Sequence, residues 1–242
     1  MPARQGGTPQ RRVPPVQRSC HRPPRHLQCL LMISRSAVRE LLAPFDLSIS
    51  DETIDKLIVY VDLLLRWNSK INLTSISTAE ECITRHFGES FQVSRLVQLR
   101  DSLLDIGSGA GFPGLALKLI APQLEVVLLE PVGKKKAFLK EVVRVCAMGQ
   151  VTVLGKRLDE FAHSEQGQTF DIVTARAVGG LELLVPAAKS LLRPDGHLCL
   201  WVGRQQVQGI REANSGLQWL EPEAIPLSRN RLIMVGVRTG RD

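Results

Sequence analysis

The residues most able to do chemistry lie in a glycine-rich turn from Ser102 to Gly114, which reads Ser-Leu-Leu-Asp-Ile-Gly-Ser-Gly-Ala-Gly-Phe-Pro-Gly. The apolar residues before Asp105 predict a strand, and the apolar run after Pro113 predicts a helix with proline at its first position. Glycines let the backbone turn sharply and leave room for a ligand against bare peptide, while the helix N-terminus offers unpaired N–H groups. This strand, turn and helix predict a nucleotide-like ligand.

Two nucleotide templates fit this turn. The spacing Gly-x-Gly-x-x-Gly at 109–114, with Glu130 downstream, satisfies the dinucleotide fingerprint, in which a distant acid holds a ribose hydroxyl. The strand ends at Asp105, however, so an acid stands just before the first glycine, Gly107. That order resembles motif I of S-adenosylmethionine-dependent methyltransferases, where the acid and the glycine turn face the amino-acid end of the cofactor. The turn alone leaves both a methyltransferase and an NAD-dependent enzyme open.

The segments that follow alternate between strand and helix, as a parallel sheet with covering helices requires. A Pro-Asp-Gly turn at 194–196 precedes an apolar strand, which is typical of a methyltransferase sheet and absent from the dinucleotide template. We therefore predict an α/β fold with a Rossmann-like class I methyltransferase sheet, mostly parallel with an antiparallel last strand, and an N-terminal helical appendage. The expected later strands are 125–130, 151–154, 170–174, 197–202, 217–225 and 232–238, and the expected helices among them are 133–145 and 181–192. Pro222 and Pro226 make the strand at 217–225 irregular.

Polar residues stand at the carboxyl ends of these strands, where open α/β sheets bind their ligands. Glu130 ends the second strand and is placed to accept both hydroxyls of an adenosine ribose. Leu158 and Asp159 follow the third strand, where a backbone N–H and an acid commonly hold adenine. Arg176 follows the fourth strand, where it either serves the site or forms a surface ion pair.

Basic residues follow the same strand ends. Lys134, Lys135 and Lys136 open a helix although their charge opposes the helix dipole, so either an RNA phosphate or a solvated face accounts for them. Lys156–Arg157 follow the third strand, and Arg204 follows the fifth. These segments form the candidate RNA-binding surface.

Three helices are expected before the sheet, beginning near Ser34, Ser50 and Glu80. The second ends in Trp-Asn-Ser-Lys-Ile-Asn-Leu-Thr at 67–74, a segment whose polar residues cap the helix and turn the chain. His86 lies in the third helix, and we interpret it as a hydrogen-bonded packing residue rather than a catalyst.

Positive charge is concentrated at the start of the chain. The chain has 31 Lys and Arg against 24 Asp and Glu, a net charge of +7, yet residues 1–31 hold six arginines and no acid. That segment is rich in proline and cannot bury enough surface to fold alone, so we expect a disordered basic extension. It is an RNA-binding arm, a transit peptide, or sequence upstream of a true start at Met32. We divide the rest into N-terminal helices (32–100) and a methyltransferase domain (101–242).

Composition argues against membrane-spanning, secreted and disulfide-rich classes of protein. No apolar run approaches the roughly 20 residues of a membrane span, and no charged start leads into an apolar stretch as in a secretory signal. The five cysteines form no Cys-x-x-Cys pair, which favours free thiols in a reducing compartment. We expect a cytoplasmic protein without a metal site, a disulfide framework or a membrane partner, and we expect a monomer.

Four segments together resemble the RsmG family, also called GidB, of bacterial methyltransferases of 16S ribosomal RNA. The resemblance covers about 32–238. Its most specific parts are the glycine turn with Phe-Pro-Gly at 112–114 and the upstream Arg-Trp-Asn and Asn-Leu-Thr groups at 66–74. The other parts are Gly-Lys and Phe-Leu within 133–139 and the segment around Arg176.

The resemblance implies S-adenosylmethionine as cofactor and 16S rRNA or the small ribosomal subunit as partner, with methyl transfer to N7 of one guanine, the guanine 527-type site of the decoding-region loop. Guanine N7 has a free lone pair, so no general base is needed, and positioning supplies most of the catalysis. Arg176 is the expected catalytic residue, fixing the cofactor, the base edge through O6, or a phosphate. The expected cofactor contacts are Asp105, Gly107, Gly109, Gly111, Phe112, Glu130, Leu158, Asp159 and Arg176, and the expected RNA contacts are Asn68, Asn72, Lys134, Lys135, Lys136 and Arg204.

Two segments depart from the family pattern. The chain has His86-Phe-Gly-Glu89-Ser90 where the family usually has His-x-x-Asp-Ser, and Arg204 follows Val-Gly where Lys-Gly often stands. An RNA-positioning role for these places therefore stays open. An NAD-dependent oxidoreductase and a non-catalytic rRNA-binding module remain as alternatives, which binding of NADH, or of RNA without S-adenosylmethionine, would reveal.

Overall fold

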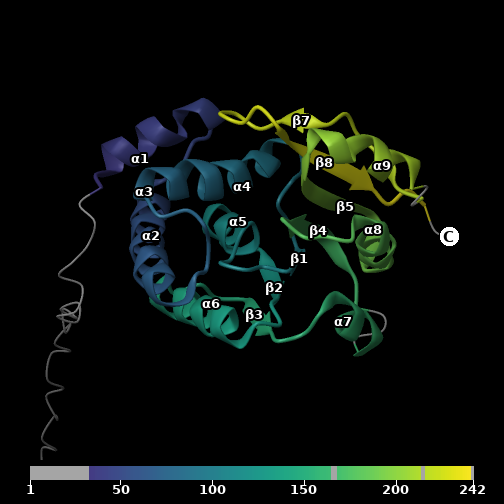
Figure 1. Cartoon of the computed structure of the whole chain (residues 1–242), viewed down its shortest axis with the longest axis horizontal. Coiled ribbons are helices and arrows are strands. Elements are labelled where there is room, and N and C mark those ends of the chain that lie inside the picture. Colours follow the sequence, from purple (N-terminus) through teal and green to yellow (C-terminus); the bar gives the residue numbers. More distant parts are fainter. Residues whose placement is uncertain (1–32, 165–167, 214–215, 241–242) are drawn as a thin grey trace, which may run out of the picture. The chain divides into compact units, whose positions relative to one another are not determined.

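An eight-stranded sheet of order β3-β2-β1-β4-β5-β8-β6, with β7 beside β8, forms the centre of the fold (Figure 1). The computed structural model describes residues 33–164, 168–213 and 216–240, so the predicted extension at 1–31 lies outside the described residues. The strands are β1 (Ser102–Ile106), β2 (Glu125–Leu129), β3 (Val151–Leu154), β4 (Phe170–Arg176), β5 (Leu192–Gly203), β6 (Gln218–Trp219), β7 (Glu223–Ala224) and β8 (Arg231–Val237).

The first five strands are parallel, and β8 runs antiparallel to β5. This arrangement confirms the predicted α/β class, with a mostly parallel sheet and an antiparallel last strand. Parallel strands bring their carboxyl ends to one side, which we call the carboxyl edge. The register there places Ile106 beside Leu129 and Arg176 beside Trp201. The segments that follow β1 to β5 therefore meet at this edge.

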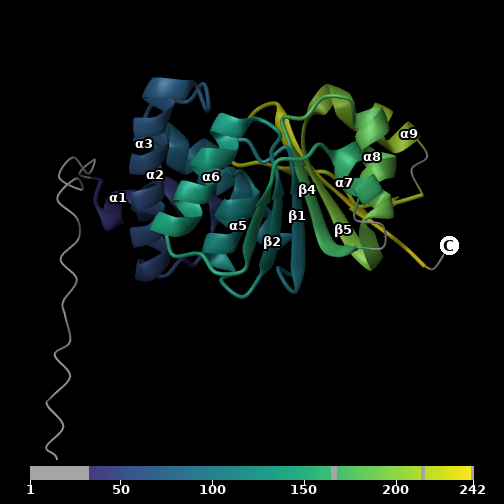
Figure 2. The ribbon, with the colours of Figure 1, turned by 90° about the horizontal axis from the view of Figure 1, so that it is seen from below.

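Helices cover both faces of the sheet. In Figure 2, α1, α2, α5 and α6 lie on one side, and α7, α8 and α9 lie on the other, in agreement with two separate hydrophobic clusters. The helices are α1 (Arg35–Leu42), α2 (Asp51–Ile71), α3 (Ala79–Glu81), α4 (Glu89–Phe91), α5 (Gly114–Ile120), α6 (Gly133–Val145), α7 (Leu158–Ser164), α8 (Leu181–Ser190) and α9 (Val207–Glu212), and the 3-10 and π segments are η2 (Ala43–Phe45), η3 (Cys82–Gly88), η4 (Gln92–Arg95) and η5 (Arg204–Gln206).

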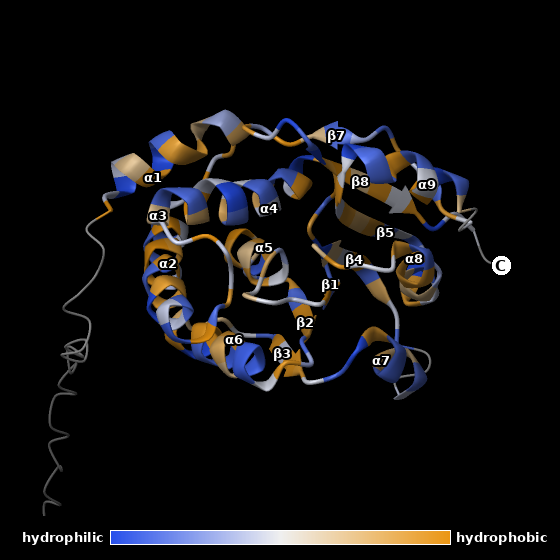
Figure 3. Cartoon of the chain, viewed as in Figure 1, coloured by the Kyte–Doolittle hydropathy of each residue, from blue (hydrophilic) through white to orange (hydrophobic). Residues whose placement is uncertain are grey.

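The long helix α2 is stabilised by a cap at its N-terminus and by an apolar stripe along its length. Ser50 Oγ accepts from Thr53 N at 3.2 Å, and acids in the first turn favour the positive end of the helix dipole. Residues at helical spacing, including Ile54, Leu57 and Val61, are buried against the sheet side. Figure 3 shows hydrophobic and hydrophilic residues on this helix, as an amphipathic covering helix requires.

The structure corrects several predicted elements. The strand expected at 217–225 is two short strands, β6 and β7, interrupted by Pro222, which has no N–H for a ladder. Helix α5 begins at Gly114, with Pro113 as its N-cap rather than its first residue. The helix expected from Glu80 contains the π-helical segment η3. Helices α7 and α9 were not predicted, because 7 and 6 residues are too few to show a helical period.

The predicted boundary between residues 100 and 101 stays a prediction. The described residues from Ile33 onward belong to one compact unit. One hydrophobic cluster contains residues from both sides of that boundary, such as Tyr60 and Phe112. The N-terminal helices therefore share a core with one face of the sheet.

Candidate active site

The glycine turn leaves β1 at the carboxyl edge with a backbone that favours glycine. Gly107, Gly109 and Gly111 have φ of +68°, +57° and +88°, a region that L side chains rarely adopt. Ser108 N donates to Leu129 O at 3.0 Å, which ties the turn to the end of β2. The backbone of the turn therefore favours glycine at all three positions.

Asp105 lies beneath this turn and is fully buried. Its Oδ2 accepts from Gly114 N at 3.2 Å, and its Oδ1 accepts from the Thr174 hydroxyl at 2.8 Å. Burial raises the pKa of Asp105 to about 6, against the opposing effect of these hydrogen bonds. The carboxyl group thus joins β1, β4 and the start of α5, and its predicted contact with the cofactor stays a proposal.

Glu130 holds the turn from the other side. Its Oε2 accepts from Gly109 N, and its Oε1 accepts from Val132 N, each at 2.8 Å, while the residue is 3% exposed. A carboxylate has about four acceptor sites, so two bonds within the protein leave capacity for a ribose hydroxyl. The predicted ribose contact stays a proposal, to which the structure adds a role in shaping the turn.

Replacing Glu130 by alanine is expected to weaken S-adenosylmethionine binding by about 10-fold or more, because the N–H groups of Gly109 in the turn and of Val132 before α6 lose their acceptor. Isothermal titration calorimetry measures the affinity. Glu130→Gln keeps one oxygen, so its affinity for S-adenosylmethionine is expected to lie between those of wild type and Glu130→Ala. Glu125→Ala removes an exposed acid from the opposite end of β2 and serves as the matched control. Wild-type affinity in Glu130→Ala would remove this residue from the cofactor site.

A cavity of about 460 Å³ opens beside the turn. Its walls include Gly107 from the turn, Leu158 and Asp159 from the start of α7, and Gly180 before α8. Its volume is within the range of about 300–1,000 Å³ that is usual for small-molecule sites. The structure thus brings together three predicted cofactor residues from two distant segments of the sequence. Its remaining lining residues are Ile106, Leu129, Pro131, Lys156, Arg157, Val178, Gly179, Leu183, Leu184 and Ala187.

Phe112 does not line this cavity and belongs to a stack of rings. It is 7% exposed and stacks between Tyr60, with ring centroids 5.4 Å apart, and His86, with centroids 4.5 Å apart. The Tyr60 hydroxyl donates to Ala110 O at 2.6 Å. The N-terminal helices therefore fix the outer side of the glycine turn. Phe112 supports that side, and its predicted contact with the cofactor stays a proposal.

Tyr60 is a site residue that the sequence analysis missed. It lies on α2 and is fully buried, and a Cβ added at Gly111 would overlap its hydroxyl. The available signal was that Tyr60 is the only tyrosine of the chain and falls on the buried side of α2. Buried tyrosine hydroxyls usually have a hydrogen-bond partner, so a specific polar contact was to be expected.

His86 has the packing role that the sequence predicted. Its Nε2 and the Thr74 hydroxyl are 2.9 Å apart, and its Nδ1 is buried without a hydrogen-bond partner among the described residues. Burial, followed by the charges of Arg176, Arg85 and Arg231, lowers the pKa of His86 to about 3. The imidazole is therefore neutral at physiological pH.

This shift predicts a pH dependence of stability. Between about pH 3 and 6.5 the unfolded chain has a protonated His86 and the folded chain has a neutral one, so unfolding takes up about one proton here. The stabilising contribution is complete above pH 6.5 and is lost as the pH falls toward 3. Chemical denaturation from pH 4 to 8 measures it, and His86→Gln is expected to lose this part of the slope. Equal slopes for both proteins would contradict the assignment.

Arg176 ends β4 at the carboxyl edge, with its side chain only 14% exposed. Its guanidinium donates to Arg85 O at 2.6 Å, to His86 O at 3.4 Å and to Glu89 Oε2 at 3.0 Å. Arg176 therefore does form an ion pair, as the alternative interpretation of the sequence expected, but the pair is buried rather than on the surface. The catalytic role of Arg176 stays a proposal.

The predicted RNA contacts differ in their surroundings. Asn68 uses its amide within the protein, donating to Ile76 O at 3.1 Å and accepting from Thr74 N at 2.9 Å. Asn72 is exposed and has a left-handed backbone at the end of α2. Arg204 is exposed, and its Nε donates to Arg229 O at 3.0 Å.

The three lysines at the start of α6 follow β2 at the carboxyl edge. Lys134 is exposed, whereas Lys135 and Lys136 are half-buried. Lys136 extends over Gly155, where an added Cβ would lie 2.7 Å from its Nζ. Within residues 33–164, 168–213 and 216–240, no ion pair joins these lysines to an acid. Their charge is thus available to an anionic partner.

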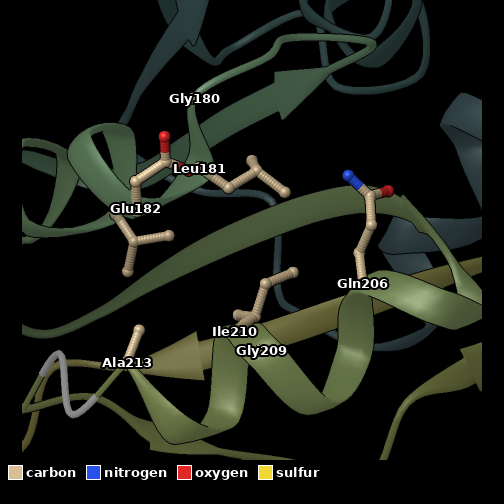
Figure 4. A pocket seen from close by; sticks show the side chains of 8 residues that line it. Gly180, Leu181, Glu182, Gln206, Gly209, Ile210 and Ala213 are labelled. Carbon is tan, nitrogen blue, oxygen red and sulfur yellow. The ribbon is translucent and has the colours of Figure 1, made fainter.

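A second cavity, of about 340 Å³, lies between the start of α8 and α9 (Figure 4). Gly180 lines both cavities, and Leu181 and Gln206 lie opposite each other across this one. The described part of the chain contains no group of three metal-binding side chains. Among its helices, none is long and apolar enough to cross a bilayer.

The sheet order, with an antiparallel last strand and a cavity at the carboxyl edge, gives this chain the class I methyltransferase fold. The chain is similar to a crystal structure of a SAM-dependent methyltransferase from Aquifex aeolicus, with a TM-score of 0.53 and 14% identity over 66% of this chain and 93% of the other. It is also similar to a ribosomal protein L11 methylase from Lactobacillus delbrueckii, with a TM-score of 0.52 and 16% identity over 63% and 80% of the two chains. These likenesses concern the fold.

Sequence comparison gives the particular family. Residues 53–231 match the GidB family, described as rRNA small subunit methyltransferase G. A ribosomal RNA small subunit methyltransferase G from Desulfitobacterium hafniense is 35% identical over 83% of this chain and 81% of its own length, and one from Syntrophotalea carbinolica is 33% identical over 83% and 96%. The chain therefore belongs to the rRNA small subunit methyltransferase G family, as the sequence predicted, and its cofactor is S-adenosylmethionine.

Proposed function

We propose that this methyltransferase methylates N7 of a single guanine in 16S ribosomal RNA, at the guanine 527-type site. The observation that carries the proposal is the cavity beside the glycine turn, which joins Gly107, Leu158 and Asp159 at the carboxyl edge of a sheet whose chain belongs to an rRNA methyltransferase family. We further propose that it acts in the cytoplasm, as a monomer, on the small-subunit RNA.

The residues present fit the cofactor. Backbone with positive φ at Gly107 leaves peptide bare beside the cavity, the Leu158–Asp159 segment offers an N–H and a carboxylate for adenine, and Glu130 has acceptor capacity for the ribose. S-adenosylmethionine supplies an electrophilic methyl group on a sulfonium. The protein has to orient the two reactants, exclude water from them and supply charged groups that bind the RNA.

Attack by guanine N7 does not need a general base among the side chains of the site. That nitrogen has a free lone pair, so no side chain has to remove a proton, and the neutral His86 is no obstacle. Holding two reactants in line removes roughly 7–11 kcal/mol of barrier. Arg176 is proposed to contact the base at O6 or a neighbouring phosphate, because donation to N7 would block the attacking lone pair.

The target base has to leave its stack to reach the carboxyl edge. Single-stranded loops present bases in this way, and flipping costs little where a base is already unpaired. The exposed cations Lys134, Arg157 and Arg204 follow β2, β3 and β5. Arg157 lines the cavity, and all three cations are proposed to hold backbone phosphates.

The test is a methylation assay with tritium-methyl S-adenosylmethionine, using 16S rRNA transcribed in vitro in one arm and purified small subunits in the other. Nuclease digestion and mass spectrometry identify the product, and 7-methylguanosine at one position is expected. Calorimetry with S-adenosylmethionine and NADH runs in parallel. NADH binding alone, or RNA binding without cofactor binding, would replace the proposal by one of the two alternatives. Light scattering of the purified protein tests the monomer.

A further inference from the structure

Glu89 is a buried carboxylate that pairs with two arginines. The residue is 1% exposed, and its Oε2 accepts from Arg176 at 3.0 Å while its Oε1 accepts from Arg231 Nη2. The Trp201 indole N–H donates to Glu89 O at 2.8 Å, which fixes the backbone that carries the carboxylate. One acid thus orients guanidinium groups from two strands.

The three charged residues come from distant parts of the chain. Glu89 belongs to α4, Arg176 ends β4 and Arg231 begins β8. Both arginines lie at the carboxyl edge, because Arg176 pairs with Trp201 and Arg231 with Gly203 along β5. The N-terminal helices therefore contribute a charged group to the same edge that carries the glycine turn.

The charge of this cluster is not balanced. Two guanidinium groups share one carboxylate, and the Nε of Arg231 is buried without a partner among the described residues. Arg231 is also the outer member of the cluster, with its side chain 35% exposed against 14% for Arg176. A surplus cation that reaches the surface favours an anionic ligand.

Further cations lie beside Arg231. Arg204 N donates to Asn230 O at 2.9 Å, and Arg204 Nε donates to Arg229 O at 3.0 Å, so the end of β5 and the segment before β8 are joined. Neither Arg204 nor Arg229 has an acidic partner in the part of the chain that the structure describes. Positive charge therefore gathers where β5 and β8 meet the carboxyl edge.

A purely stabilising role explains this arrangement poorly. Burying a carboxylate and a guanidinium costs desolvation energy, and their mutual attraction often does no more than offset this cost. A buried ion pair is therefore weak evidence for stability. Here a second guanidinium adds repulsion between like charges. Arg176 also donates to two backbone carbonyls, so its planar fork is held in one orientation.

We propose that Glu89 is a positioning residue that holds Arg176 and Arg231 as one double-guanidinium unit, and that Arg231 binds an RNA backbone phosphate next to the target guanine. The inference rests on the proposed methyl transfer and adds two residues to it. In this unit Arg176 serves the reacting base and Arg231 serves the RNA backbone. Glu89 itself touches neither.

Steady-state kinetics on 16S rRNA or small subunits test the two roles separately. Glu89→Gln removes the charge but keeps the size, and it is expected to lower kcat about 10- to 100-fold while the Kd for S-adenosylmethionine stays within twofold of wild type. Arg231→Gln is expected to raise KM for RNA about 10-fold, with kcat within threefold, and to reduce the slope of log KM against log salt by about one. Arg193→Gln, which removes an arginine paired with Asp171, is the control.

Glu89→Asp, which retains the carboxylate, is expected to recover most of the lost kcat, an outcome that a volume effect would not give. If Glu89→Gln does not fold, Glu89→Asp and Arg231→Gln decide between the outcomes. Wild-type kcat in Glu89→Gln, or an unchanged KM and salt slope in Arg231→Gln, would overturn the inference. A wild-type protein that makes no 7-methylguanosine would instead refute the proposed function.

Discussion

Arg176→Ala is expected to abolish detectable methylation, a loss of at least about 100- to 1,000-fold in kcat/KM, while the fold persists. The residue is held at the carboxyl edge by two carbonyls and one carboxylate, so its side chain has one defined orientation. Glu89 keeps its pair with Arg231 after the substitution, so no buried carboxylate is left alone. The assay is tritium-methyl incorporation, with thermal denaturation as the measure of folding.

Two further variants sharpen this result. Arg176→Lys keeps the charge but lacks the planar fork that bonds several acceptors at once, so its activity is expected to remain far below wild type. Arg193→Ala removes another arginine of the sheet, bound to Asp171 at 2.7 Å, and is expected to keep full kcat. Full activity of Arg176→Ala would refute the catalytic role.

Gly111→Ala is expected to destroy the cofactor site. Its Cβ would overlap the Tyr60 hydroxyl and lie 2.9 Å from Leu115 Cδ1, and the φ of +88° is unfavourable for any L side chain. Overpacking costs about 1–3 kcal/mol, and a left-handed backbone adds about 1–2 kcal/mol. The free energy of unfolding should fall by about 3 kcal/mol, and binding of S-adenosylmethionine by calorimetry should be lost.

Alanine at Gly149 is the matched control, because a Cβ there meets nothing within 4 Å. Adding Tyr60→Phe to Gly111→Ala removes the overlapping hydroxyl and should restore part of the stability. Tyr60→Phe alone leaves Ala110 O without its donor and should cost about 1 kcal/mol. A Gly111→Ala protein with wild-type stability and cofactor affinity would show that the turn does not need this close contact.

The longer helices and strands were predicted from caps and apolar patterns in the sequence. The cap at Ser50, the apolar strand before Asp105 and the alternating strands and helices that follow all correspond to the structure. Short elements were harder, because β6, β7, α7 and α9 contain from 2 to 7 residues and show no period. Their form depends on pairing with β8 and packing on the sheet.

The candidate site was predictable where it follows the sheet. The carboxyl ends of parallel strands meet at one edge, so Gly107, Leu158 and Asp159 were expected near one another, and one cavity contains all three. The contacts of Tyr60 and Glu89 were not predictable. They bridge 50 and 87 positions of the chain, to Ala110 and Arg176, and no local pattern marks such a pairing.

Sequence also could not distinguish ligand contacts from internal hydrogen bonds. Asn68 is a predicted RNA contact, which stays a prediction, and its amide bonds to Ile76 and Thr74 within the protein. Glu130 was predicted to face a ribose, and the structure shows that it also bonds to Gly109 N. Polar residues near a site can shape its backbone as well as contact its ligand.

The aromatic stack on Phe112 has a consequence for how the protein can be divided. One side of the glycine turn is built by Tyr60 and His86, both of which precede β1. A fragment cut at the start of the sheet would keep every motif residue of the turn and lose the rings that support it. The conformation of the glycine turn therefore depends on α2 and η3 as well as on the sheet, and a fragment that is to keep this turn has to include both.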